Sequence, residues 1–314
     1  MKDIMMARWA VRSKFFFLLL LPGLTWLFLF FLIPLFIVFS MSYGQKVDII
    51  DIDYNWSLIN YARATDGVYF VTLFKSVIIS LITTFLCLLI AIPVAFYISF
   101  SSVRIKSILL VSILLPLWTN LLIRTYSLIA LLRTKGHINN ALENLWESAN
   151  YLLSFFRLAN HNFIGESFTP LSLMHNNFSV IFGLIYIYVP FMIIPIYLVL
   201  EKIDRNILEA SYDLGANHKI TFFKIIMPNI SVGITSGIIL VFIPCLGSFI
   251  IPELLGGADS QMIGNIIERQ FKSANDWPFG SALSFILIYI TIIILGVRYV
   301  YSKLYSRLYQ RGVS

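Results

Sequence analysis

The residues best suited to a chemical role lie in a polar, basic segment, residues 201–229, between two strongly hydrophobic runs. At fixed spacings it contains an acid, two small residues, a glycine, an isoleucine and a proline: Glu209, Ala210, Ser211, Gly215, Ile225 and Pro228. These side chains suit non-covalent docking. Ala210 and Ser211 are small enough to let a partner surface approach closely, and Glu209 adds a charge beside them.

The same segment predicts two short helices. Apolar residues recur at helical spacing: Ile203, Ile207, Leu208 and Leu214. Gly215 predicts a left-handed cap that ends the first helix, and Asn217 is a favoured residue to begin a second. Pro228 is expected at the first turn of a following membrane helix, where a missing N–H is tolerated.

The pattern from Glu209 to Pro228 resembles the EAA loop of ATP-binding-cassette (ABC) importer permeases. Ser211 stands where the family has a second alanine and Met227 where it has leucine, so small and apolar character is kept. The resemblance implies a cytoplasmic helix that docks into a groove of a separate ATPase subunit. It assigns this coupling role to the residues Glu209, Ala210, Ser211, Gly215, Ile225 and Pro228.

Composition predicts an all-α integral membrane protein. The chain is 59% hydrophobic and 12% charged, unlike a soluble domain. Six apolar runs are long enough to cross a bilayer, which takes about 20 residues. They lie near residues 15–41, 72–99, 107–132, 178–200, 230–252 and 279–301. The first is too long for a signal-peptide core and lacks a cleavage site, so it is expected to remain as a helix.

The basic residues predict the orientation of the chain. Thirteen of its 23 Lys and Arg residues lie in connections on the side of both termini, and seven on the other side. The positive-inside rule therefore places both termini and segment 201–229 in the cytoplasm. The expected organisation is a cytoplasmic segment 1–14, a permease domain 15–301 and a cytoplasmic tail 302–314.

No motif for catalysis or cofactor binding is present. The chain lacks a phosphate-binding G-x-x-x-x-G-K-[ST] loop, so any ATP that drives it must bind a separate subunit. Cys87 and Cys245 fall inside apolar runs, and the four histidines lack ligand spacing. We therefore expect a transport subunit rather than an enzyme, with no metal, no cofactor and no nucleic-acid partner.

Three further stretches narrow the resemblance to spermidine/putrescine importer permeases of the B or H type. They are residues 115–126 (LPLWTNLLIRTY), 252–257 (PELLGG) with 262–265 (MIGN), and 276–284 (DWPFGSALS). The resemblance implies the type I ABC importer fold in the bacterial inner membrane. It also implies that the chain contacts membrane lipid and three kinds of protein partner. These are two copies of an ATP-binding subunit, a second permease subunit of the C or I type, and a periplasmic polyamine-binding protein.

A polyamine is an extended polycation, so its path should offer carboxylates, carbonyl oxygens and aromatic faces. Glu253 and Asp276 are the expected acids at the entrance, with Trp277 beside them. Pro244 is expected to interrupt the fifth span and free carbonyl oxygens. The candidate aromatic walls are Trp118, Tyr126, Tyr186 and Tyr188. Outer connections hold 11 acids against 7 bases, which suits a cation, although the positive-inside bias gives the same asymmetry.

Two other functions remain open. One is a type I importer permease for a phosphonate, sulfate or ferric ion; an anion path should show buried Arg or helix N-termini. The other is an ATP-independent secondary transporter, which would need acids or histidines inside its spans and would leave the EAA-like segment unexplained.

Overall fold

The computed structural model describes residues 19–48, 51–155 and 168–311. The chain divides into two compact units. Unit 1 comprises residues up to Gly67 and from Ile267 onward, and unit 2 comprises Val68–Ile266. The expected segment 1–14, the first residues of the first span and the end of the tail lie outside the described residues.

Unit 1 is built on two long apolar helices. Its elements are a helix over Leu19–Ser42 that includes α2 (Ile33–Ser42), strands β1 (Gln45–Lys46) and β2 (Ile52–Asp53), α3 (Ile59–Ala64) and α14 (Trp277–Arg311). The two strands form an antiparallel hairpin in which Gln45 pairs with Asp53. Helix α14 packs against α2 and α3, and the rings of Phe39 and Phe285 meet edge to face at 5.2 Å.

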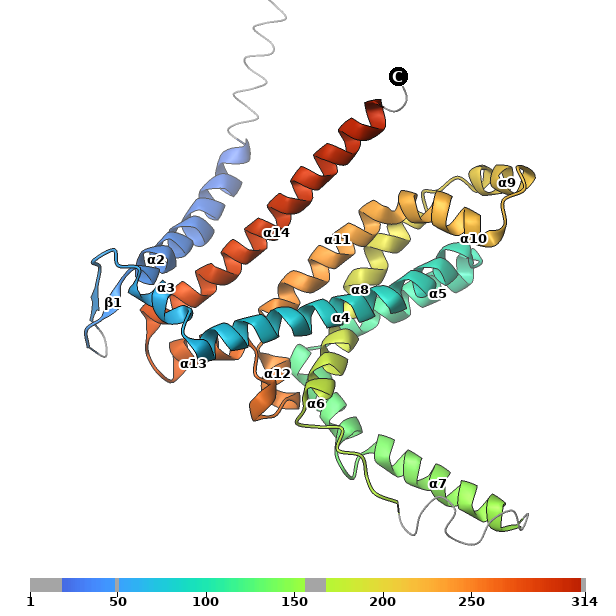
Figure 1. Cartoon of the computed structure of the whole chain (residues 1–314), viewed down its shortest axis with the longest axis horizontal. Coiled ribbons are helices and arrows are strands. Elements are labelled where there is room, and N and C mark those ends of the chain that lie inside the picture. The colour runs from blue at the N-terminus through green and yellow to red at the C-terminus, as the bar shows by residue number, and fades with distance from the viewer. Residues whose placement is uncertain (1–18, 49–50, 156–167, 312–314) are drawn as a thin grey trace, which may run out of the picture. The chain divides into compact units, whose positions relative to one another are not determined.

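Unit 2 is helical throughout its described part. Its elements are α4 (Gly67–Phe100), α5 (Val103–Leu114), α6 (Leu121–Leu132), α7 (His137–Phe155), α8 (Asn177–Leu200), α9 (Arg205–Asp213), α10 (His218–Thr221), α11 (Met227–Leu246), α12 (Ile250–Leu255) and the start of α13 (Ile263–Lys272). Helices α8 and α11 lie side by side, with α9 and α10 at one end of the pair and α12 at the other (Figure 1).

The third expected span, near 107–132, is not one helix. Helix α5 passes into a 3₁₀ turn, Leu115–Trp118, and the following helix leaves at an angle of 100°. Thr119 and Asn120 are extended, and Asn120 Oδ1 accepts the N–H of Leu122 at 2.8 Å, which caps α6. The apolar run hid this break because Pro116 and Asn120 interrupt a helix, while their apolar neighbours keep the mean hydropathy of the run high. Within the described residues there are thus five candidate spans, and a sixth if the bent pair is counted as one span.

A π-helical turn, Phe222–Ile226, precedes Pro228. Proline cannot donate a backbone hydrogen bond, so a helix that contains it must satisfy nearby carbonyls in another way. The missing N–H of Pro228 affects the carbonyl of Lys224, four residues earlier, and the next carbonyl, that of Ile225, accepts a hydrogen bond of 2.7 Å from Asn229 Nδ2. Pro228 therefore lies inside a continuous helical stretch, His218–Leu246, which joins segment 201–229 directly to a membrane-spanning helix.

Helices α8 and α11 meet backbone to backbone at two glycines, Gly233 and Gly237. A Cβ added at Gly233 would lie 2.7 Å from the carbonyl oxygen of Pro195, and one at Gly237 would lie 2.5 Å from Met192 Sδ. In a membrane, helices associate through close packing, and small residues four apart permit this approach. The glycine pair therefore fixes the spacing of α8 and α11.

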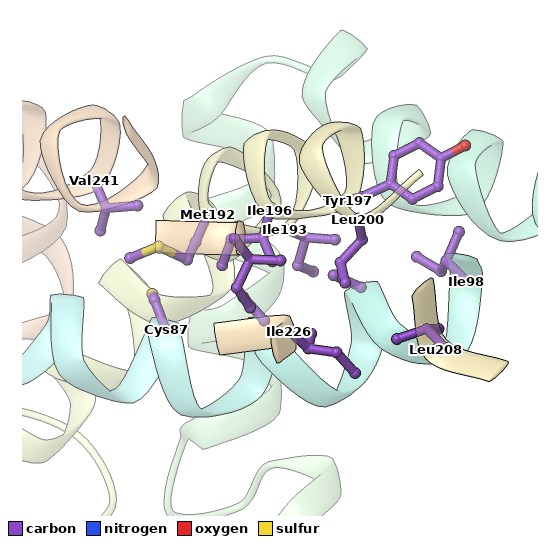
Figure 2. Close-up of a cluster of buried hydrophobic side chains, with 13 residues drawn as sticks. Cys87, Ile98, Met192, Ile193, Ile196, Tyr197, Leu200, Leu208, Ile226 and Val241 are labelled. Carbon is purple, nitrogen blue, oxygen red and sulfur yellow. The ribbon is translucent and has the colours of Figure 1, made fainter. Parts of the chain in front are cut away.

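Around this contact lies the main cluster of buried side chains in unit 2 (Figure 2). It joins residues of α4, α8, α9 and α11 with one from the π-helical turn: Cys87, Ala91, Ala95, Ile98, Met192, Ile193, Ile196, Tyr197, Leu200, Leu208, Ile226, Ile230 and Val241. Leu208 and Ile226 come from segment 201–229, so that segment is continuous with the core.

We predict that Gly233→Ala lowers the stability of the protein by about 1–3 kcal/mol, because its new methyl group meets backbone atoms of α8 that cannot move alone. Gly237→Ala should be milder, since Met192 Sδ can rotate away. The measurement is the midpoint of thermal unfolding in detergent. Gly296→Ala is the control, because a Cβ there meets nothing within 4 Å. Equal midpoints for Gly233→Ala and the control would contradict the close contact.

Candidate functional site

Helix α9 is the central element of segment 201–229. Asp204 precedes it and accepts the N–H of Asn206 on Oδ1 at 3.0 Å, so the first turn has a side-chain cap. At its other end Gly215 has φ of +80°, a conformation that glycine adopts without strain. The N–H groups of Gly215 and Ala216 donate to the carbonyls of Tyr212 and Ser211, at 2.9 and 3.0 Å, which completes a Schellman cap.

A second helix follows this cap at once. The side chain of Asn217 accepts the N–H of Ile220 at 2.9 Å and begins α10. Both expectations from the sequence, a left-handed cap at Gly215 and a helix start at Asn217, are confirmed. The segment is therefore a helix, a tight turn and a second helix, with hydrogen-bonded caps at both sides of the turn.

Two polar contacts join the arms of this turn. Ser211 Oγ lies 3.0 Å from Thr221 Oγ1, and Tyr212 Oη lies 3.0 Å from His218 Nδ1. Ser211 is buried, whereas the sequence favoured a surface position beside Ala210. The reason is helical geometry, because Ser211 lies three residues after the buried Leu208 and shares its face.

The outer surface of α9 carries the remaining motif residues. Glu209 and Ala210 are exposed, and Leu214 at the end of the helix is 89% exposed. The sequence grouped Leu214 with the inward apolar residues, but the Schellman turn directs it outward. Segment 201–229 thus combines a buried anchor, Leu208, with an exposed helix surface that carries Glu209, Ala210 and Leu214 as well as Ile207 and Asp213.

The other two coupling candidates lie further along the segment. Ile225 is half-buried and its carbonyl is bound by Asn229, while Pro228 is exposed on the same continuous helix. Both occupy the junction between the two short helices and α11.

In unit 2, Glu253 lies on α12 and is exposed, and its Oε2 accepts a hydrogen bond of 2.9 Å from Asn265 Nδ2. Asn265 is 1% exposed and also donates to the carbonyl of Phe249 at 2.9 Å. The buried amide therefore holds the carboxylate at a fixed position. Sequence analysis did not single out Asn265, although it belongs to the MIGN stretch.

Pro244 does not interrupt its helix, contrary to expectation. Helix α11 continues to Leu246, and the carbonyl of Pro244 accepts a hydrogen bond from Tyr188 Oη at 3.2 Å. The break comes three residues later, at Gly247. There the backbone of Gly264 lies so close that an added Cβ would stand 2.6 Å from the carbonyl oxygen of Ser248.

The two aromatic candidates of unit 2 lie on either side of the broken span. Trp118 ends the 3₁₀ turn and is 90% exposed, and Tyr126 on α6 is 57% exposed. Both rings are available for contact with a ligand, a lipid or another chain.

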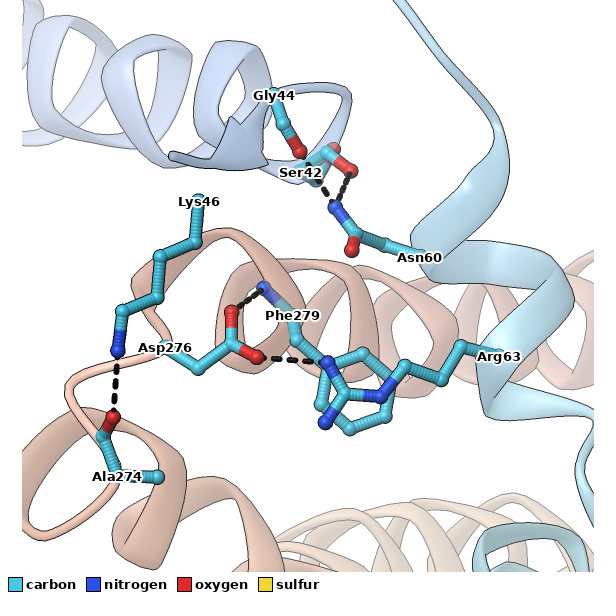
Figure 3. Close-up of polar contacts among 8 residues, drawn as sticks. All are labelled: Ser42, Gly44, Lys46, Asn60, Arg63, Ala274, Asp276 and Phe279. Atoms are coloured by element: carbon cyan, nitrogen blue, oxygen red, sulfur yellow. Dashed lines mark hydrogen bonds and ion pairs between the residues drawn. The ribbon is translucent and has the colours of Figure 1, made fainter. Parts of the chain in front are cut away.

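In unit 1, Asp276 has protein partners on both oxygens (Figure 3). Oδ2 lies 2.7 Å from Arg63 Nη1, and Oδ1 accepts the N–H of Phe279 at 3.2 Å at the start of α14. The Arg63 guanidinium also stands 4.0 Å above the ring of Phe279. Asp276 therefore caps α14 and forms an ion pair with Arg63, so both of its carboxylate oxygens already have protein partners.

Trp277 borders a cavity of about 520 Å³ in unit 1. The cavity is also lined by Lys46, Asp48, Asp51 and Tyr54, so it combines carboxylates with aromatic side chains. Lys46 Nζ donates to the carbonyl of Ala274 at 2.9 Å, which directs that cation to the backbone.

A polar contact beside the hairpin supports α3. Asn60 Nδ2 donates to the carbonyls of Ser42 and Gly44, at 3.2 and 2.7 Å (Figure 3). Burial raises the pKa of Tyr61 well above its ordinary value, so its phenol stays protonated at 2.9 Å from Ser42 Oγ.

Comparison with known proteins gives a consistent result. The family described as "Binding-protein-dependent transport system inner membrane component" matches residues 67–304. The spermidine/putrescine transport system permease protein PotB of Salmonella typhimurium (strain SL1344) is 36% identical over 302 residues, covering 96% of this chain and 97% of the relative. PotB of Escherichia coli (strain K12) is 36% identical over 282 residues, covering 90% and 96%.

A solved structure shares the fold. A chain of a bacterial ABC transporter involved in the import of the acidic polysaccharide alginate superposes with a TM-score of 0.60. The match covers 95% of this chain and 98% of that chain at 15% sequence identity. Together with the family match over residues 67–304, this superposition confirms the expected fold class, a helical type I ABC importer permease.

We predict that Gly215→Ala loosens the turn between α9 and α10, because a side chain at φ +80° costs about 1 kcal/mol. Hydrogen exchange of the amides of residues 205–221 should become about fivefold faster. Gly23→Ala is the control, since Gly23 has open space around its Cβ position and lies in a helix. Unchanged exchange in Gly215→Ala would show that the cap does not hold the segment.

Proposed function

Because the chain belongs to the family of binding-protein-dependent transport system inner membrane components, we propose that it is the permease subunit of an ATP-driven importer for spermidine and putrescine. It is a multi-pass protein of the inner membrane with several apolar helices. The choice of solute is supported by two relatives that carry that description and match nearly the whole chain at 36% identity.

The observation that carries the importer role is the construction of segment 201–229. Its helix α9 is capped at both ends, is fixed to the core by Leu208, and exposes Glu209, Ala210 and Leu214. Such a surface suits a groove on another protein, with a charge for pairing and an apolar side chain for insertion. We assign this partner as the separate ATP-hydrolysing subunit, present in two copies.

The orientation follows from the basic residues of the connections, which place both termini and segment 201–229 in the cytoplasm. The opposite end of unit 2, with α12 and Glu253, then faces the periplasm. A periplasmic polyamine-binding protein would dock there and on the outer loops. A second, related permease subunit would complete the pathway.

The mechanism proposed is alternating access. Closure of the ATPase pair on ATP binding displaces α9, and the contact from Ser211 to Thr221 prevents α9 from moving without α10. Because α10 is continuous with α11, and Leu208 packs with residues of α4 and α8, the displacement passes to the membrane helices. The outer mouth opens while the binding protein is docked, and hydrolysis restores the inward state.

The candidate substrate-contact residues fall into two groups: those whose side chains are accessible to a ligand and those already bonded to other residues of the protein. Glu253 keeps an exposed carboxylate held by Asn265, and it remains our preferred acid for a polyamine amine group. Trp118 and Tyr126 expose aromatic faces, and Trp277 borders the cavity that holds Asp48 and Asp51. Asp276 is engaged by Arg63, and Pro244 by Tyr188. We assign them positioning roles beside the path.

We predict that Glu209→Lys abolishes ATP-coupled uptake while the protein still inserts into the membrane. Reversing a charge inside a docking interface costs about 2–5 kcal/mol, which lowers the affinity for the ATPase more than tenfold. Radiolabelled spermidine uptake and co-purification of the ATPase are measured together. Glu143→Lys is the control, since it reverses an exposed acid on α7, outside segment 201–229. Normal uptake by a well-expressed Glu209→Lys protein would refute the docking role.

A second prediction concerns the solute. ATPase activity of the reconstituted complex should rise with a binding protein loaded with spermidine or putrescine, and not with sulfate, phosphonate or iron.

Glu253→Gln should lower maximal spermidine uptake by about fivefold or more, since a charge-assisted hydrogen bond contributes about 1.5–3 kcal/mol. Glu143→Gln, an exposed acid on α7, serves as the control. Stimulation by another solute alone would keep the importer architecture and exclude polyamines.

A further inference from the structure

An ion pair fastens the base of segment 201–229 to helix α5. Glu201 directly follows α8 and is the first residue of the segment. Its two carboxylate oxygens lie 2.6 and 2.7 Å from Nζ of Lys106, and Oε2 also lies 3.5 Å from Ser99 Oγ at the end of α4. One carboxylate thus connects the end of α8 with residues that lie 95 and 102 positions earlier.

Each charge of this pair is poorly placed for its own helix. Lys106 lies in the first turn of α5, where the positive end of the helix dipole disfavours a cation. Glu201 caps the C-terminus of α8, where exposed carbonyls disfavour an anion. The two side chains cancel these unfavourable placements only by meeting one another. If these side chains only faced solvent, the helix dipoles would favour an acid at position 106 and a base at position 201.

Neighbouring cations do not share this arrangement. Arg104 and Lys202 flank the pair along the chain and are exposed, and neither forms an ion pair with the described residues. The Lys106 side chain, by contrast, is only 16% exposed. Ion pairing and burial therefore distinguish Lys106 from the other positive charges at this end of unit 2.

Helix α5 has few other ties near its start. None of its residues is fully buried, and Val103 in its first turn is 80% exposed. Leu109, Leu110 and Ile113, further along α5, pack partly against the main cluster. The ion pair is thus the polar connection between the beginning of α5 and the segment that contacts the ATPase.

We propose that Lys106 and Glu201 are positioning residues that make α5 move together with segment 201–229, so that the broken third span joins the ATP-driven motion of α8 and α11. This inference rests on the importer function proposed above. Without the pair, α9 still binds the ATPase through Glu209, but displacement of the segment no longer carries α5.

The test uses the complete complex with its ATPase and binding protein in proteoliposomes, and measures spermidine imported per ATP hydrolysed. Lys106→Met and Glu201→Gln should each retain stimulated ATPase activity and lower this ratio by about fivefold or more. The exchanged pair, Lys106→Glu with Glu201→Lys, should restore it because the ion pair is rebuilt and each charge then suits its helix end. Arg104→Gln, an exposed cation on the same helix as Lys106, is the matched control and should transport like the parent protein.

Lys106→Arg keeps the charge and should retain the parent ratio, which separates charge pairing from folding. An unchanged ratio in both single variants would overturn the proposal. So would failure of the exchanged pair to recover, or equal losses in Lys106→Arg and Lys106→Met. Failure of the underlying function has a different signature, because the parent complex itself would then show no stimulated ATPase activity.

Discussion

The close contact of α8 and α11 at Gly233 and Gly237 is the constraint on which the rest of unit 2 depends. Segment 201–229 leaves the end of α8 and returns into α11, so the spacing of these two helices fixes both of its ends. A longer distance between them would separate Leu208 and Ile226 from the core cluster that they share. The docking surface that we propose on α9 is therefore positioned by a packing contact within the membrane helices.

Given that constraint, the segment can transmit force because its own parts are joined. A Schellman cap at Gly215 and the Ser211–Thr221 contact make the two short helices one body, and a continuous helix leads from it into α11. Helices that were separated by flexible loops would absorb a displacement locally. The π-helical turn before Pro228 permits a proline at this junction without ending the helix.

Local chemistry made the two short helices of segment 201–229 predictable, whereas long-range pairing could not be read from the sequence. The residue types of Gly215 and Asn217 were enough to predict a left-handed helix end and a helix start, because both depend only on neighbouring residues. Hydropathy identified the apolar runs but not the break at Asn120, since one polar cap changes the local hydrogen bonding but hardly alters the mean hydropathy of a long apolar run. The spacing of Gly233 and Gly237 was a signal for close helix packing that sequence analysis passed over. No local signal joins Lys106 to Glu201, which lie 95 residues apart.

The most direct test of the central claim is site-specific cross-linking from α9 in membranes that contain the complete transporter. Cysteine is placed at Ala210, which is exposed, or at Ser211, which is buried beside it. The native thiols, Cys87 and Cys245, are both buried. A cross-link to the ATP-hydrolysing subunit from position 210 and none from 211 is the predicted result. Cross-linking to that subunit from Ala258→Cys, at the opposite end of unit 2, with none from position 210, would contradict the account.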